Sequence, residues 1–254
     1  MSAMTDTGSF LNRLPAEGQG IVSDAQERGL RVRLLGGIAI RLLLADRFDQ
    51  AFDRPYRDVD VICGRKDGRG LEELLAARGW APAAEFNALN GSRRLLFHDP
   101  ASEAQVDVFV GEFSMCHALP LADSLDRPGP SLPATDLVMT KLQIVELNAK
   151  DRSDLYALLS GCDVGDGDPA AIEPARMASL TGRDWGLHHT FELNLARLRE
   201  GVSSGEGPAS ASTAIDALIA AMEAEPKSRA WKMRARIGER KRWYELPEEV
   251  DREG

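Results

Sequence analysis

The sequence predicts an α+β fold, in which a mixed β-sheet flanked by helices is followed by a helical C-terminal region. Two observations support this fold class. Residues 30–113 alternate between short apolar strand patterns and helical patterns, and beyond the proline-rich segment at residues 126–137 the spacing turns helical. The 254 residues, 43% of them hydrophobic, can bury one large core or two modest ones.

The N-terminal elements follow from apolar periodicity and from glycine and asparagine turns. A polar N-terminus precedes the first helix, Gly36-Gly37 joins the first strand to the second helix, and Asn90-Gly91 is expected to form a turn. The expected order is helix, strand, helix, strand, helix, strand and strand, at residues 21–30, 31–37, 38–48, 58–63, 70–80, 93–100 and 104–113.

The C-terminal half shows helical spacing with Ser and Asp cap candidates. A Gly/Ser stretch at residues 201–212 is typical of a flexible linker. Helices are expected at residues 136–148, 152–160, 169–180, 189–200 and 213–225. This gives four parts: a core at 1–125, a helical domain at 133–200, the linker at 201–212, and a helix with a basic arm at 213–254.

Charge is unevenly distributed along the chain. Residues 227–242 hold eight basic residues against one acid, Glu239, so this segment carries +7 and the remainder −16 of the net −9. The net charge argues against non-specific nucleic-acid binding by the whole protein. No stretch approaches the roughly 18 apolar residues of a membrane helix, and no secretory signal is recognisable, so we expect no membrane partner and a cytoplasmic protein with reduced cysteines.

Acidic residues interrupt two strands that otherwise have core composition. Asp58 and Asp60 alternate with valines, so both carboxylates must point to one side of the sheet, and Asp107 stands between valines on a later strand. Gly36-Gly37 lies between a strand end and a helix start, where free backbone N–H groups and the helix dipole favour phosphate. Carboxylates are the ligands that Mg²⁺ prefers, and three from adjacent strands can hold two ions about 4 Å apart.

The segments LLGGIAIRLL, RDVDVIC and QVDVFVG resemble the nucleotidyltransferase superfamily of the DNA-polymerase-beta-like type. TDLVMTKLQIVELNAKDRSDLYALL is similar to the AbiEii-like bacterial nucleotidyltransferases. The resemblance covers roughly residues 30–160. About twenty residues separate the glycine turn from Asp58, more than is usual in the superfamily, and we interpret them as a loop at the active-site mouth.

The resemblance implies a metal-dependent enzyme that moves an NMP from an NTP to an acceptor and releases pyrophosphate. Asp58 and Asp60 would bind Mg²⁺ or Mn²⁺, and Asp107 would complete the metal site and act as general base. Gly36, Gly37, Lys141 and Lys150 would contact the phosphates, with Asp151 and Asp154 in support. The residues 133–200 would complete the cleft.

The acceptor is left open between an RNA end, a protein hydroxyl and a small molecule. A toxin-like role with an antitoxin-like protein partner follows from the AbiEii resemblance. The alternative function is a non-catalytic module that binds RNA or a partner protein through its basic arm. Residues 227–244, with Trp231, Trp243 and Tyr244 interleaved, are the candidates for RNA contact.

Each feature also has a structural interpretation. Asp58 and Asp60 could be strand-end residues paired with Arg54 and Arg57, and the two glycines could form only a tight turn. Lys141 could be a surface residue whose stem lies along apolar neighbours, and Asp154 could cap or brace a helix. The basic arm could be a solvated face or could contact the protein's own acidic surface. His188-His189 is interpreted as a helix start.

Overall fold

The computed structural model describes residues 13–246 and has the α+β architecture expected from the sequence, with a mixed sheet and a helical C-terminal region. The chain divides into two compact units. Of the described residues, the first contains 13–113 together with Pro120–Leu137, and the second contains Ser114–Leu119 together with 138–246. Each unit is described by itself below.

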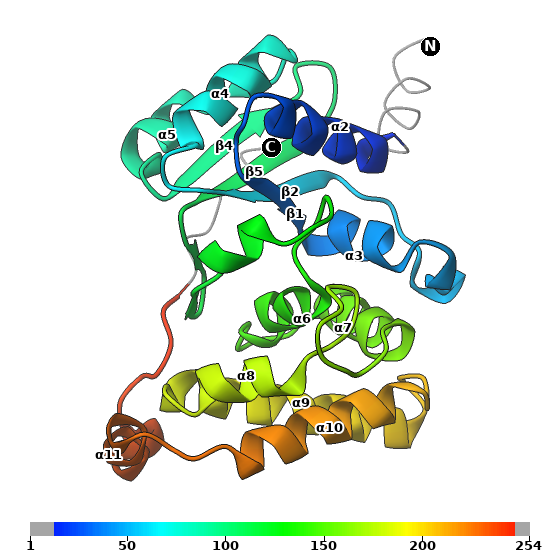
Figure 1. Cartoon of the computed structure of the whole chain (residues 1–254), viewed down its shortest axis with the longest axis vertical. Helices are drawn as coiled ribbons and strands as arrows, with labels where there is room; N and C mark the ends of the chain where they lie inside the picture. The colour runs from blue at the N-terminus through cyan, green and yellow to red at the C-terminus, as the bar shows by residue number, and fades with distance from the viewer. Residues whose placement is uncertain (1–12, 247–254) are drawn as a thin grey trace. The chain divides into compact units, whose positions relative to one another are not determined.

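A five-stranded sheet forms the centre of the first unit (Figure 1). Its strand order is β1-β2-β5-β4-β3, with β2 and β5 parallel and the other neighbours antiparallel. The strands are β1 (Val32–Leu35), β2 (Asp58–Cys63), β3 (Ala81–Pro82), β4 (Arg94–His98) and β5 (Gln105–Val110). The helices are α2 (Leu14–Glu27), α3 (Gly36–Leu44), α4 (Gly68–Ala77) and α5 (Ala84–Asn90), with 3-10 turns at Ala45–Arg47, Gln50–Phe52 and Ala122–Asp126.

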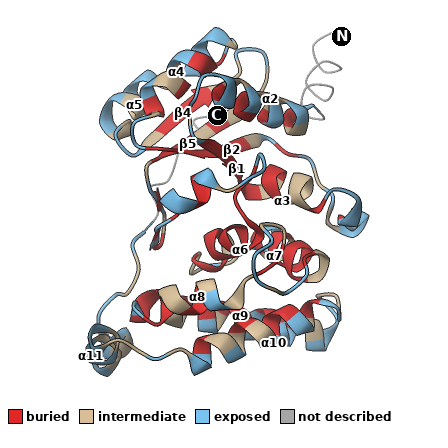
Figure 2. Cartoon of the chain, in the orientation of Figure 1, coloured by how far each residue is buried: buried red, intermediate tan, exposed pale blue. Residues whose placement is uncertain are grey.

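Alternation along β2 and β5 separates an apolar face of the sheet from an acidic one. Val59, Val61, Val106 and Val108 are fully buried, whereas the aspartates between them are only partly covered. Helix α2 lies on the apolar face, where Gly18 lets its backbone approach Val59. The valines of β2 and β5 therefore belong to the buried core of this unit, and the alternating aspartates point to the other face. The strands of the sheet are largely buried (Figure 2).

Most predicted elements of the first unit are present, with shifted ends. The strand over residues 58–63 matches β2 at both ends. The first helix begins at Leu14 instead of residue 21, with Pro15 in its first turn, a position that tolerates proline because the N–H there has no helical partner. The short β3 and α5 were not predicted. Helix α5 is fixed by Asn87, whose side chain pairs with both backbone groups of Leu96 on β4.

The second unit consists of helices with a two-stranded ribbon. The ribbon strands are β6 (Phe113–Ser114) and β7 (Ala118–Leu119). The boundary between the two units falls between the two residues of β6. The division also falls inside α6. The helices are α6 (Ala134–Leu142), α7 (Ala149–Gly161), α8 (Pro174–Thr181), α9 (Trp185–Ser204), α10 (Ala211–Ala224) and α11 (Arg229–Ile237), followed by a 3-10 turn at Gly238–Arg240.

Helix α6 ends at Leu142, six residues earlier than the sequence suggested. The side-chain amide of Asn194 on α9 donates to the carbonyls of Leu142 and Ile144, and so satisfies groups that a continuing helix would have used. Asn148 then caps α7 by accepting a hydrogen bond from the backbone N–H of Asp151. The single helix expected over residues 136–148 is therefore wrong. This segment contains the last part of α6, a connection, and the N-cap of α7.

The Gly/Ser stretch at 201–212 is not a free linker in this structure. Its first four residues complete α9, and α10 begins at Ala211. The glycines serve close packing: a Cβ at Gly201 would lie 2.1 Å from the Tyr156 hydroxyl, and one at Gly207 would lie 2.4 Å from the Tyr156 ring. The Tyr156 hydroxyl also donates to the carbonyl of Leu198. Composition suggested flexibility here because it does not reveal which side chain the glycines face.

The three cysteines are buried free thiols. Burial raises the pKa of Cys63 to about 12, with a smaller contribution from the charge of Asp67. In the part of the chain that the structure describes, no helix has the length and apolar character needed to cross a membrane.

Candidate functional site

Strands β2 and β5 bring the three predicted aspartates to one face of the sheet. Asp60 and Asp107 are direct partners in the parallel register, and Asp58 lies two residues before Asp60 on the same side. All three residues are partly exposed, unlike the valines between them. The sequence therefore placed these carboxylates correctly on one face of neighbouring strands.

The glycine turn lies directly against this acidic face. Leu35 pairs with Asp60 across β1 and β2, and Gly36 follows as the first residue of α3 with φ +70°. A Cβ at Gly36 would lie 1.9 Å from Oδ2 of Asp60. Only glycine combines this backbone conformation with such close approach of the carboxylate. Gly36 and Gly37 thus belong to the first turn of α3, whereas the sequence suggested that the helix begins after them.

Arg54 lies against the second glycine. A Cβ at Gly37 would lie 2.4 Å from a terminal nitrogen of Arg54, and the guanidinium also sits over the ring of Tyr56, 5.0 Å from its centroid. Arg57, the other arginine considered as a partner of the Asp pair, instead forms an ion pair with Glu103 at 3.2 Å. The N-cap residue of α3 is Leu35, whose apolar side chain makes no capping hydrogen bond to the first backbone N–H groups of this helix.

Asp107 is bound by an arginine that the sequence analysis did not select. Nε of Arg94 donates to Oδ1 of Asp107 at 2.9 Å, and a terminal nitrogen donates to Oδ2 at 2.5 Å. Each side chain is only 14% exposed. The Arg94 guanidinium also lies 5.2 Å from the Phe109 ring centroid. The sequence shows Arg94 as a basic residue at the start of β4, the strand that pairs with β5. Whether its side chain can contact Asp107 depends on the register between these two strands.

The metal site expected at the three carboxylates stays a prediction. Among residues 13–246, no group of three or more His, Cys, Asp and Glu side chains is arranged to hold a metal ion. The physical reason at Asp107 is that both oxygens are engaged by Arg94. Carboxylate oxygens remain suitable donors for Mg²⁺, and metal binding by Asp58 and Asp60 therefore stays a proposal.

Lys141, Asp151 and Asp154 form a buried ionic cluster in the second unit. Nζ of Lys141 lies 2.9 Å from Oδ1 of Asp151 and 2.9 Å from Oδ2 of Asp154. Burial by itself lowers the pKa of Lys141, but the two carboxylates outweigh it and hold this pKa above its ordinary value. Lys141 is thus neither an exposed surface residue nor directed to solvent.

The two remaining supporting predictions have different outcomes. Lys150, predicted to contact phosphate, is exposed in the first turn of α7 and is not part of the buried cluster. Asp154 braces α7 against Lys141 of α6, while the capping role that was considered for it belongs to Asn148. The geometry joins Lys141 to both aspartates, and the roles of these residues toward a nucleotide stay predictions.

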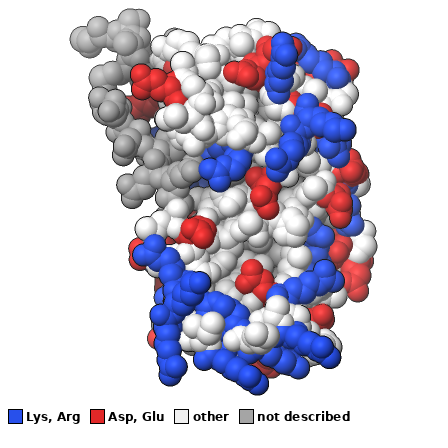
Figure 3. Space-filling model, turned by 90° about the vertical axis from the view of Figure 1, so that its left-hand side faces the viewer, with Lys and Arg blue, Asp and Glu red and all other residues white. Residues whose placement is uncertain are grey.

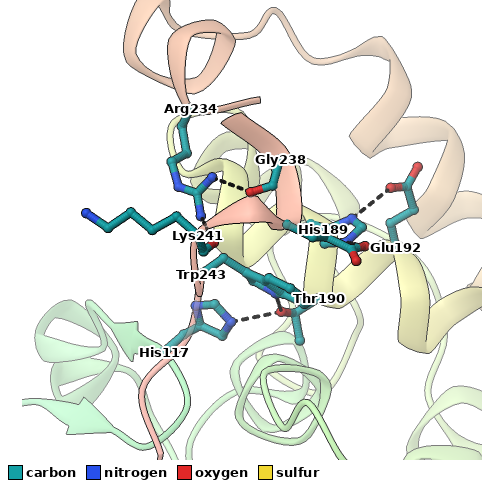
Figure 4. Close-up of polar contacts among 9 residues, drawn as sticks. His117, His189, Thr190, Glu192, Arg234, Gly238, Lys241 and Trp243 are labelled. Carbon is teal, nitrogen blue, oxygen red and sulfur yellow. Dashed lines mark hydrogen bonds and ion pairs between the residues drawn. The ribbon is translucent and has the colours of Figure 1, made fainter. Parts of the chain in front are cut away.

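Part of the basic arm is docked on helix α9 (Figure 4). The indole N–H of Trp243 donates to Oγ1 of Thr190, which also contacts Nε2 of His117 at 2.9 Å. Arg234 donates to the carbonyls of Gly238 and Lys241. Its guanidinium also lies over the ring of Trp185, a residue of α9.

The docked aromatic rings stack on their own protein. His189 stacks on Trp185 and pairs with Glu239 at 2.8 Å, and Trp243 meets both of these rings edge-on. Trp231 makes an edge contact with His188. In this structure the rings expected to stack on RNA bases are therefore used within the second unit.

The other cations of the arm face solvent. Six of the eight are exposed, and in the described part of the chain none of the six forms an ion pair: Arg229, Lys232, Arg236, Arg240, Lys241 and Arg242. We call these six residues the basic surface. Lys and Arg side chains gather in the lower part of the view in Figure 3. The arm is thus partly a bracing element and partly an unneutralised surface.

Fold and site together define an α+β protein that presents carboxylates from two parallel strands on one sheet face, beside a glycine turn that opens a helix. No family model matches the sequence, and no curated protein sequence matches it. Among solved structures, the chain is similar to the lincosamide antibiotic adenylyltransferase LnuA with lincomycin bound, with a TM-score of 0.41 and 15% identity. The match covers 55% of this chain and 92% of that one.

Proposed function

We propose that the protein is a nucleotidyltransferase that moves a nucleoside monophosphate from an NTP to an acceptor hydroxyl. The observation that carries this proposal is the contact between the acidic face and the glycine turn: Asp60 lies directly against Gly36, and Asp107 is its register partner. A helix N-terminus whose N-cap residue is the apolar Leu35 suits a triphosphate, and carboxylates beside it suit an attacking hydroxyl.

In the proposed reaction the acceptor oxygen forms a bond to the α-phosphorus of the NTP, and the bond from that phosphorus to the bridging β-phosphate oxygen breaks. Pyrophosphate leaves with the electron pair, and the hydroxyl proton passes to Asp107. Each carboxylate oxygen has two lone pairs, so the Arg94 ion pair still leaves Asp107 capacity to accept this proton. The backbone N–H groups at Gly36 and Gly37 orient the phosphates.

Asp58 and Asp60 are the proposed ligands of Mg²⁺ or Mn²⁺. When bound, such an ion would offset the charge of the phosphates. Of the two lysines proposed to contact the phosphates, Lys150 is exposed, whereas the ammonium of Lys141 is held by two carboxylates. A role for Lys141 in phosphate contact, and a cleft completed by residues 133–200, remain part of the proposal.

Label transfer tests the enzymatic proposal. The purified protein is incubated with each of the four α-labelled NTPs, with Mg²⁺ or Mn²⁺ and a cell extract. We expect one or more labelled products with the wild type and with Asp46→Asn, a matched exposed carboxylate on the loop after α3. The variant Asp58→Asn/Asp60→Asn should form none. Equal labelling by this variant, or no labelling by the wild type under any condition, would contradict the proposal.

A second candidate function is a non-catalytic module that binds RNA or a partner protein. The basic surface favours it, because six exposed cations have no ion-pair partner in the described residues. For RNA, each phosphate contact contributes about 0.7 to the slope of log K against log salt for single strands. Fluorescence anisotropy with a labelled single-stranded RNA, measured from low to physiological salt, tests this candidate.

The charge-matched comparison uses two double variants. Lys232→Gln/Arg236→Gln removes charge from the basic surface, and Lys66→Gln/Arg69→Gln removes the same charge from exposed residues of the first unit. RNA binding is expected to weaken only in the first. Equal weakening would assign the effect to net charge. A toxin-like role with an antitoxin-like partner also stays a proposal, tested by whether induced expression arrests growth in an Asp58-dependent manner.

A further inference from the structure

A cavity of about 560 Å³ lies in the first unit between α3 and the loop that leads into β2. This volume falls within the ~300–1,000 Å³ typical of small-molecule sites. Arg41 and Leu42 of α3 line one side, and Asp53, Arg54 and Tyr56 of the loop line the other. Apart from Pro15 of α2, the lining of the cavity belongs to the long connection between the glycine turn and the Asp pair.

Arg41 is pre-oriented at this cavity. One face of its guanidinium covers the ring of Phe48, 4.7 Å from the centroid, and one terminal nitrogen donates to the carbonyl of Ala45 at 3.3 Å. Within residues 13–246, Arg41 forms no ion pair. A half-buried guanidinium held by a ring and a carbonyl, without a carboxylate, is a receptor for an anionic group.

The backbone beside Arg41 is strained. Ala45 has φ 44° and ψ −114°, and among the described residues it is the only non-glycine residue with positive φ. Such conformations are unfavourable for a residue with a Cβ and are concentrated at functional sites. Here the strained residue is the one whose carbonyl accepts from Arg41, so its conformation sets the direction of the guanidinium.

The opposite side of the cavity offers complementary groups. The Arg54 guanidinium is placed over the Tyr56 ring and against Gly37. Asp53 is exposed, and its Oδ1 accepts from the backbone N–H of Arg54 at 3.1 Å. Within the described residues, Asp53 forms no ion pair. An anionic group of a ligand could pair with the arginines here, and a ligand hydroxyl could donate to Asp53. Leu42 would then contact the carbon skeleton of the ligand.

We propose that this cavity binds a small hydroxylated molecule through an anionic group, a phosphate or carboxylate, held by Arg41. On the proposed function, on which this assignment rests, that molecule is the acceptor of the nucleotidyl group. The chain supports this position, because Tyr56 at the cavity is two residues from Asp58 and Arg41 lies four residues after Gly37. The binding site itself requires no catalytic turnover.

Calorimetric titration and melting shifts test the binding site directly. The probes are glycerol 3-phosphate, ribose 5-phosphate and glucose 6-phosphate, with glycerol, ribose and glucose as neutral counterparts. The full chain and Arg47→Gln, an exposed arginine on the same loop that does not line the cavity, should bind at least one phosphate and none of the neutral molecules. Arg41→Gln should bind at least tenfold more weakly, with Arg41→Lys intermediate.

Additional measurements distinguish this proposal from its alternatives. Circular dichroism and the ligand-free melting temperature should match among the variants, so that lost binding is not lost folding. Binding should persist in saturating ADP if the anion belongs to an acceptor, and displacement by ADP would instead assign the cavity to the nucleotide's phosphates. No binding of any probe, equal binding by Arg41→Gln, or displacement by ADP would each overturn the proposal. Label transfer remains a separate test, because this assay uses no turnover.

Discussion

Arg94 and Asp107 form a two-pronged ion pair across β4 and β5, although the register places Arg94 opposite Phe109 and Asp107 opposite Leu96. The pair is therefore diagonal, and it is mostly shielded from solvent, with 14% of each side chain exposed. This contact decides both how the acidic face is neutralised and which lone pairs of Asp107 remain available.

Removing the arginine should leave a shielded carboxylate without its cation. We expect Arg94→Gln to lower the free energy of unfolding by about 2 kcal/mol, because a partly buried charge loses its partner. Urea denaturation of Arg94→Gln, Asp107→Asn and the double variant measures this. The double variant should cost less than the two single costs added together, since both single variants break the same contact. Strict additivity would show that the contact does not contribute in solution.

The same variant also tests whether Asp107 completes the metal site, as the resemblance implies. If Arg94 competes with a cation for Asp107, Arg94→Gln should bind Mn²⁺ more tightly than the wild type, as measured by the loss of free Mn²⁺ signal in electron paramagnetic resonance. Arg69→Gln, which removes an exposed arginine with equal charge, serves as the control. Unchanged affinity in Arg94→Gln would separate Asp107 from the metal site.

Gly36 and Gly29 provide a matched pair for the glycine turn. Both have positive φ, of +70° and +74°, but a Cβ at Gly29 would meet nothing within 4 Å, whereas one at Gly36 would collide with Asp60. Gly29→Ala should cost about 1 kcal/mol from backbone conformation alone. Gly36→Ala should cost at least about 3 kcal/mol, because overpacking adds to the same backbone cost. Equal costs in thermal denaturation would show that Asp60 does not lie against the turn.

Lys141 should be essential to the stability of the second unit, whereas Lys150 should not. Lys141→Met leaves two buried carboxylates without a cation and should cost about 3–5 kcal/mol, and exposed Lys150→Met should change stability by less than about 0.5 kcal/mol. Adding Asp151→Asn and Asp154→Asn to Lys141→Met should restore part of the loss. If the triple variant is no more stable than Lys141→Met, the cluster is not the cause.

Two histidines, the buried His117 and the partly exposed His188, should make the second unit sensitive to acid. Burial, together with the charges of Lys227 and His189, lowers the pKa of His188 to about 4, and burial lowers the pKa of His117 against the opposing charge of Asp184. An unfolded histidine titrates near 6.5, so between about pH 6.5 and 4 the unfolded chain binds more protons. Stability should therefore fall as the pH falls through this window.

Melting curves at pH 7 and pH 5 measure this effect. With allowance for the partial exposure of His188, its share is about 1 kcal/mol, or roughly 2–4 °C in a chain of this size. His188→Gln should reduce the difference between the two melting temperatures, and His98→Gln, in the first unit, should not. An unchanged pH dependence in His188→Gln would assign the acid sensitivity to other groups.

The sequence was sufficient where a local pattern determines the structure. Alternation of Asp with Val predicted the ends of β2 and the shared face of Asp58 and Asp60, because side-chain direction in a strand depends only on residue parity. The ion pair of Arg94 was not predictable in this way, because it depends on the register between β4 and β5. Likewise, the glycines near residue 201 were misinterpreted because their partner, Tyr156, is distant in sequence.

In the candidate site, too, local patterns were predictable from the sequence and contacts between distant segments were not. Three carboxylates and two glycines follow from motif and parity, but their neighbours do not. The two carboxylate partners of Lys141 were placed near it only by resemblance, and their burial as one cluster required the packing of α6 and α7. The short elements β3 and β7 have two residues each, too few for any periodicity to be visible.

The buried thiol of Cys63, at the end of β2, can report how often this part of the first unit opens. Only a thiolate reacts quickly with alkylating reagents, and burial keeps this group protonated at neutral pH. Modification must then wait for β2 to separate from its neighbours, which makes the labelling rate of this single sulfur a measure of how often the acidic strand opens. The residue that ends the strand can thereby report on the lifetime of the arrangement that holds Asp58 and Asp60 in place.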